Sequence, residues 1–179
     1  MSRPEFSRPV RLRQIDSRPV SLTATEEERA ALARRFGIRA IDRLEAEIAL
    51  IRDGDRVIVD GTMIADIVQS CAVSGDDLPV PVEEEFALRF VPAGSFRPPE
   101  EGDEIEIEIE LDSDDCDEVE YEGDSIDLGE AVAQTLALAI DPYAQGSGAD
   151  EARAVAGIES DETPRGPLAD ALAALKKAD

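Results

Sequence analysis

The sequence predicts an α+β protein, in which an antiparallel β-sheet is accompanied by two to three helices. Three observations favour this class. Several stretches alternate apolar and polar residues, two others repeat apolar residues at helical spacing, and turn signals separate them. The alternation leaves open whether the sheet curls into a partial barrel. Because aromatic residues make up only 4% of the chain and tryptophan is absent, we expect an aliphatic core.

The first elements are a short strand and a helix. "FSRPVRLRQI" (6–15) alternates weakly, and Pro9 confines such a strand to a sheet edge because it has no N–H to donate. "SLTATEEERAALARRFG" (21–37) predicts a helix. Thr25 and Glu28 have the spacing of a capping box, and Gly37 is a typical helix stop.

An antiparallel meander is predicted next. "RDGD" at 52–55 carries the Asp-Gly pair of a hairpin turn, and Asp60-Gly61 gives a second turn signal before "TMIADIVQSC" (62–71). The strand that precedes the first turn has four alternating apolar residues, Leu44, Ala46, Ile48 and Leu50.

Two later stretches also alternate. "VPVEEEFALRF" (80–90) predicts a strand with Val82, Glu84, Phe86 and Leu88 on one face, and 91–103 reads as a loop. "EIEIEIEL" (104–111) alternates without exception, so a slip of one residue would bury its glutamates.

The C-terminal third contains two further helical patterns. Asp127 and Glu130 have capping spacing at the start of the first helix, and Asp141-Pro142 ends it. Residues 144–166 are rich in Gly, Ser and Asp and are predicted to be mobile. "PLADALAALKK" (167–177) predicts a short helix with leucines on one side, which needs a docking surface to persist.

Charge is distributed unevenly along the chain. The formal net charge is −24, yet residues 1–43 hold ten of the 18 basic residues against six acids. Residues 100–124 contain fifteen acids and no base. Such a segment is either a solvated acidic loop or a polyanionic surface that binds a basic protein, and in both cases it repels nucleic acid and anionic membranes.

The composition argues against catalysis. Histidine is absent, which removes the commonest general base and the commonest zinc ligand. No glycine-rich loop has the spacing of a phosphate-binding motif, and "DSDDCDE" (112–118) lacks the glycine and the final glutamate of a calcium loop. A carboxylate hydrolase would need a buried acid pair that nothing here marks. We therefore expect no enzyme activity, cofactor, metal or small-molecule substrate.

Cys71 is followed by Ser74, where a metal knuckle or a redox pair would have a second thiol. Cys116 is the other cysteine of the chain, and two thiols without histidine make a poor zinc site. No apolar run approaches the ~20 residues of a membrane span, and the N-terminus lacks the apolar core of a secretory signal. The expected location is the cytoplasm.

The order of these motifs resembles the bacterial and plastid YceD family, the large ribosomal RNA subunit accumulation proteins. The resemblance includes the "RDGD" hairpin, "IVQSC" followed by "VPVEEEFALRF", and the acidic stretch. It continues with "SIDLGEAVAQTLALAIDP" and closes with "GPLADALAALKK". Many family members carry Cys-x-x-Cys where this chain has Cys71 and Ser74, so the resemblance implies that Cys71 and Ser74 are the remnant of a cysteine pair.

The resemblance implies a non-enzymatic role in the synthesis, processing or stability of 23S ribosomal RNA. It also implies one α+β domain over residues 1–145, followed by a flexible linker and a short amphipathic helix over 146–179. The alternative is an acidic adaptor protein not connected to ribosomes.

The charge asymmetry suggests where partners bind. We expect an acidic face to hold a basic ribosomal protein or an rRNA-processing factor, with RNA contact indirect or weak and confined to Arg8, Arg11 and Arg13. The candidate acidic face comprises Glu104, Glu106, Glu108, Glu110, Asp112, Asp114, Asp115, Asp117 and Glu118.

Overall fold

The computed structural model describes residues 4–16, 18–95 and 117–158, which fall into two units. The main unit comprises residues 1–69 and 79–142, and the small unit comprises residues 70–78 and 143–179. The described elements are β1 (Pro9–Arg11), a short 3-10 helix η1 (Leu12–Gln14), β2 (Val20–Thr23), α1 (Glu26–Phe36), β3 (Ala40–Asp53), β4 (Arg56–Ser70), β5 (Asp77–Pro92), β6 (Asp117–Tyr121), β7 (Ser125–Asp127), α2 (Leu128–Ala139) and α3 (Ala149–Val155).

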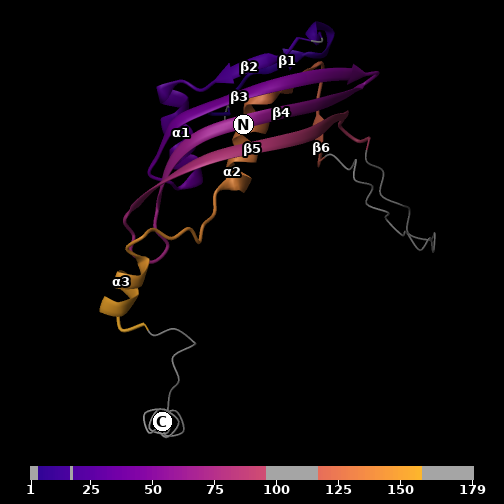
Figure 1. Cartoon of the computed structure of the whole chain (residues 1–179). Coiled ribbons are helices and arrows are strands. Elements are labelled where there is room, and N and C mark those ends of the chain that lie inside the picture. The colour runs from indigo at the N-terminus through magenta and orange to yellow at the C-terminus, as the bar shows by residue number, and fades with distance from the viewer. Residues whose placement is uncertain (1–3, 17, 96–116, 159–179) are drawn as a thin grey trace, which may run out of the picture. The chain divides into compact units, whose positions relative to one another are not determined.

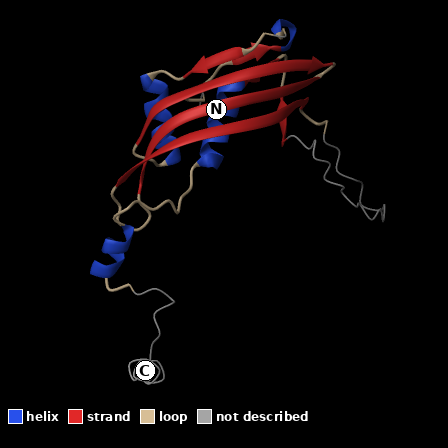
Figure 2. Cartoon of the chain, in the orientation of Figure 1, coloured by secondary structure: helices blue, strands red, loops and turns tan. Residues whose placement is uncertain are grey.

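The main unit is built on a five-stranded sheet with the strand order β2-β3-β4-β5-β6 (Figure 1). β1 pairs with β7 in a separate two-stranded sheet. Both α1 and α2 lie behind the strands in the orientation of Figure 2, so they cover the same face of the larger sheet. The predicted α+β class is confirmed, and among the described strands the sheet stays open, with β2 and β6 at its edges.

Alternation along β3 and β4 places one row of aliphatic side chains against the helices. In the antiparallel register Leu44 lies opposite Ala65, and Leu50 lies opposite Val59. All four are buried, as is Leu32 from α1. A fully buried Leu or Val contributes about 1.5–3 kcal/mol relative to an exposed one, so this row is a major source of stability.

The predicted turn at Asp60-Gly61 is wrong, because β4 runs without interruption through both residues. Gly61 instead lies on the core face, opposite Ile48, where a Cβ atom would sit 2.6 Å from the Phe86 ring. The glycine makes room for an aromatic ring from β5. A glycine inside a strand often marks such a close approach, which a turn signal in the sequence does not distinguish.

Both predicted helices of the main unit are present. In α1, the Thr25 hydroxyl accepts from the Glu28 N–H while the Glu28 carboxylate accepts from the Thr25 N–H, which completes the capping box. Gly37 ends α1 with a φ of 70°. In α2, the Asp127 carboxylate accepts from the N–H groups of Gly129 and Glu130, and Leu128, Val132 and Leu136 are buried.

Two features differ from the sequence-based expectation. β6 lies within the stretch predicted as an acidic loop, and it pairs with β5 in parallel, so the sheet is only mostly antiparallel. α3 occupies part of the stretch 144–166, where no regular element was predicted. The strand predicted at 104–111 and the helix predicted at 167–177 lie outside the described residues.

Candidate functional site

The described part of the acidic face begins at β6. Asp117 and Glu118 are exposed there, and Glu118 lies 3.4 Å from the guanidinium of Arg89 on β5. The other seven acids predicted for this face fall within residues 96–116, outside the described residues. The partner-binding role of the face therefore stays a prediction, and Asp117 and Glu118 show where its C-terminal end meets the sheet.

Beside these two acids lies an open groove of about 600 Å³ between α2 and the strands β5 and β6. Its floor is apolar, and Leu138 of α2 projects into solvent with 85% of its surface exposed. The lining side chains are Glu84, Glu85, Phe86, Ala87, Leu88, Asp117, Glu118, Val119, Ala131, Gln134, Thr135, Leu138 and Ala139. Four of these carry a negative charge and none carries a positive one, so the groove combines an apolar floor with an acidic rim.

Alternation in the sequence placed Phe86 and Leu88 on one face of a strand but did not reveal the groove. The signal was present in Glu84, which shares that face. An acid on an otherwise apolar face indicates that the face is open to water at that point, because an unpaired buried carboxylate is costly. The helix that forms the other wall could not be placed from periodicity alone.

The three N-terminal arginines have different surroundings. Arg11 is exposed. Arg13 is exposed as well and lies 3.3 Å from the Asp124 carboxylate. Arg8 is partly buried, and its guanidinium donates to both carboxylate oxygens of Glu28, at 2.7 and 2.8 Å. Contact between these arginines and RNA stays a prediction.

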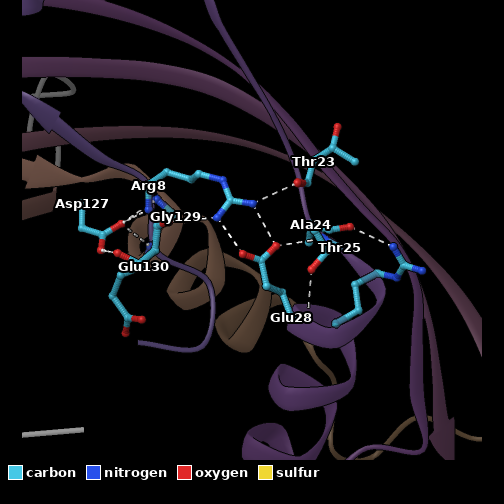
Figure 3. A network of polar contacts seen from close by, with 10 residues as sticks. Arg8, Thr23, Ala24, Thr25, Glu28, Asp127, Gly129 and Glu130 are labelled. Carbon is cyan, nitrogen blue, oxygen red and sulfur yellow. Dashed lines mark hydrogen bonds and ion pairs between the residues drawn. The ribbon is translucent and has the colours of Figure 1, made fainter. Parts of the chain in front are cut away.

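Arg8 joins the N-termini of the two helices, as Figure 3 shows. Its side chain binds Glu28 of the α1 capping box, and its backbone N–H donates to Asp127, the N-cap of α2, at 2.7 Å. The Ser7 hydroxyl donates to the other Asp127 oxygen at 2.6 Å. The bond to Arg8 lowers the pKa of Glu28 to about 2. This cluster stabilises the fold, and only its two helix caps were predictable from residue spacing in the sequence.

A second arginine connects the same helices. Arg35, near the end of α1, donates to both carboxylate oxygens of Glu130 at the start of α2, at 3.0 and 2.8 Å. It also lies 3.2 Å from Glu5. These bonds raise the pKa of Arg35 and lower that of Glu130. Arg8 and Arg35 together pair positive charge of the N-terminal region with acids in the first turns of both helices.

Cys71 lies in the small unit, in a tight turn that follows β4. Its sulfur accepts from the backbone N–H groups of Ser74 at 3.4 Å and Gly146 at 3.3 Å. The Ser74 side chain, together with these N–H groups, lowers the pKa of Cys71 to about 6, although the residue is only 4% exposed. The turn supplies donors that stabilise a thiolate, and the interpretation of Cys71 and Ser74 as the remnant of a cysteine pair stays a prediction.

Metal ligands do not converge within the described ranges. No group of three or more Cys, Asp or Glu side chains there is arranged to hold a metal ion. None of the described helices is both long and apolar enough to cross a bilayer.

The fold and the groove define an acidic α+β protein with an open, acid-rimmed surface site. A family profile described as "Large ribosomal RNA subunit accumulation protein YceD" matches residues 59–177, more than half of the chain, and the chain belongs to this family. No curated protein and no solved structure matches the chain significantly. The groove lies entirely within the matched residues, whereas Arg8, Arg11 and Arg13 precede them.

Proposed function

We propose that this protein is a non-enzymatic, cytoplasmic factor in biogenesis of the large ribosomal subunit. It supports the synthesis, processing or stability of 23S ribosomal RNA by holding a basic protein on an acidic surface. The observation that carries the proposal is membership of a family described by accumulation of large-subunit ribosomal RNA. The absence of histidine from the whole sequence supports a role without general acid-base catalysis.

Electrostatics favours a basic protein over RNA as the direct partner. With 42 acids against 18 bases, the chain repels phosphate over most of its length. Of the basic residues near the N-terminus, Arg8 and Arg35 are engaged by carboxylates. A basic ribosomal protein or processing factor is attracted by the same field that repels RNA. The protein then acts on RNA indirectly, through the basic protein that it binds.

A sucrose-gradient profile of cells that lack the protein tests the function. We expect a deficit of large subunits, restored by a tagged copy that sediments with large-subunit precursors. A normal profile, with the tagged protein only at the top of the gradient, would overturn the proposal and favour an adaptor unconnected to ribosomes.

The charge mechanism has its own test. Association with precursor particles should weaken steeply as salt rises, because screening acts on exposed charges. Replacing acids of 104–118 by lysine should weaken it further. Association that survives both treatments would contradict the acidic-surface mechanism while leaving the role in biogenesis intact.

A further inference from the structure

We propose that the groove between α2 and the strands β5 and β6 binds an amphipathic basic helix of a partner protein, an inference that rests on the proposed function and names its binding site. One apolar side of that helix would lie on the groove floor, and its lysines and arginines would lie along the acidic rim.

The floor offers apolar surface that the fold leaves uncovered among the described residues. Phe86, Leu88 and Val119 are only partly buried, although each packs against the main core. Leu138 is 85% exposed on the opposite wall. Two walls of aliphatic and aromatic side chains around an open channel are typical of a groove that accepts the apolar face of a helix.

The Phe86 ring contacts the neighbouring strand β4. It lies against Gly61 of β4, so closely that a Cβ atom on that residue would be 2.6 Å from the ring. A rigid aromatic side chain loses little conformational entropy when a ligand covers it, and such side chains often dominate binding energy. The contact with Gly61 fixes the Phe86 ring on its β4 side and leaves part of the ring exposed.

The rim determines the sign of the partner's charge. Glu84, Glu85 and Asp117 are exposed at the groove, and none of the described residues that line it is basic. Glu118 completes the rim and is partly neutralised by Arg89 at 3.4 Å. Carboxylates around an apolar floor attract Lys and Arg and repel nucleic acid.

The dimensions fit a short helix. Residues 131–139 of α2 line the groove, which corresponds to about 12–14 Å of wall. A helix lying along that wall would present about two to three turns, with apolar residues at positions i, i+3 or i+4, and i+7. Helix axes that pack together are about 8–10 Å apart, which is the distance expected between the partner helix and α2.

Other occupants suit the groove less well. A second copy of this chain would bring another net charge of −24 to an acidic rim. The chain's own 167–177 segment has leucines at helical spacing but only two lysines against one aspartate. A basic amphipathic helix of a partner protein complements both the apolar floor and the acidic rim.

Amide NMR of the full chain, titrated with two designed peptides, tests the proposal. The first peptide, of about 18 residues so that a helix can form, carries leucines on one helical face and lysines elsewhere. The second has the same composition with leucines and lysines shuffled. We expect the first to shift amides within 84–88, 117–119 and 131–139 and to bind at least about tenfold more tightly than the second. Equal affinity of the two peptides, or amide shifts near acidic residues outside these three ranges, would overturn the proposal.

Variants with matched controls locate the site. Leu138→Ser should weaken the amphipathic peptide about fivefold or more, as truncation of an anchoring contact does. Val155→Ser, at a residue 86% exposed on α3, should have no effect. The triple change Glu84→Gln, Glu85→Gln, Asp117→Asn should weaken binding more than the equal charge change Asp42→Asn, Asp60→Asn, Glu151→Gln. Equal effects within each pair would contradict the assignment.

Two results would assign the groove to a different occupant and so overturn the proposal. Dimerisation that Leu138→Ser abolishes would assign it to a second copy. Peptide binding that appears only after Leu172→Asp and Leu175→Asp would assign it to the chain's own C-terminal segment.

The sucrose-gradient profile of deleted cells that carry groove variants separates this inference from the proposed function. If Leu138→Ser and the triple groove variant both restore normal large subunits in deleted cells, the groove is not the working site, yet the role in biogenesis stands. If the deletion itself leaves the gradient unchanged, the proposed function fails, and peptide binding still reports on the groove.

Discussion

Glu28 performs two tasks with one carboxylate. It accepts from the Thr25 N–H at 2.8 Å within the α1 capping box, and it receives both guanidinium bonds of Arg8. Both tasks require the ionised form. The pKa of Glu28 falls from an ordinary value of 4.5 to about 2, chiefly through the bond to Arg8. Its contribution to stability is therefore complete above pH 4.5 and lost as the pH falls through about 2.

Glu28→Gln should lower the free energy of unfolding at neutral pH by about 1–2 kcal/mol, after allowance for solvent screening of a partly exposed pair. Urea denaturation at several pH values measures this. The gap between wild type and variant should shrink below pH 4.5, because the carboxylate of the unfolded wild-type chain is then protonated and favours unfolding, and it should close near pH 2, where the native carboxylate is protonated as well. Glu27→Gln is the control, since Glu27 is exposed in the same helical turn. A gap that stays constant down to pH 2 would contradict the assignment.

A second prediction for a single residue concerns the pKa of the Cys71 thiol. Hydrogen bonds from the Ser74 side chain and from the N–H groups of Ser74 and Gly146 lower its pKa to about 6, from an ordinary value of 9.0. The ultraviolet absorbance of the thiolate, as the difference between wild type and Cys71→Ser, should titrate near pH 6. Ser74→Ala should move the midpoint upward, because the hydroxyl donor is lost. A midpoint near 9 in the wild-type protein would refute the thiolate environment.

At the scale of elements, sequence patterns were reliable where one local interaction decides the outcome. The capping box at Thr25, the hairpin at 52–55 and the N-cap at Asp127 all depend on residues a few positions apart, and all three are confirmed. The spacing of residues within a short segment does not show which distant residue a side chain will contact. Nothing around Arg8 indicates that it joins two caps 20 and 119 residues away.

Gly61 shows how a distant partner overrides a local signal. The Asp-Gly pair favours a turn, but the chain continues as β4, paired with β3 on both sides of Gly61, and the Phe86 ring occupies the space where a side chain would lie. The same limit applies to the groove. Its floor was visible as alternation in 80–90, whereas the position of α2 and the parallel pairing of β6 depend on tertiary packing.

Gly61→Ala should destabilise the protein by about 1–3 kcal/mol, since overpacking forces the Phe86 ring or the strand to move. Gly148→Ala is the control, because a Cβ there would meet its nearest atom at an ordinary 3.7 Å. Thermal unfolding of both variants measures the difference. Additional replacement of Phe86 by Leu should recover part of the loss. If the loss is equal in both glycine variants, the close approach is not its cause.

At the scale of the whole molecule, net charge opposes folding. A formal charge of −24 repels itself in any compact state, and salt screens that repulsion. The melting temperature should therefore rise between low salt and physiological ionic strength, where the screening length shortens from about 30 Å to about 8 Å. Scanning calorimetry across this range checks the expectation. A falling melting temperature would mean that attractive pairs such as Arg8–Glu28 outweigh the overall repulsion.

The contact between Arg8 and Asp127 has a consequence for how the chain is made. β1 pairs with β7, and the Arg8 N–H binds an N-cap 119 residues further along. During synthesis at about 5–20 residues per second, the N-terminal segment waits roughly 6–24 s before its partner has been translated. Throughout that interval the buried ring of Phe6 has no finished core to enter. Codon choice and translation speed between 8 and 127 should thus influence the yield of native protein more than the speed of the last fifty codons.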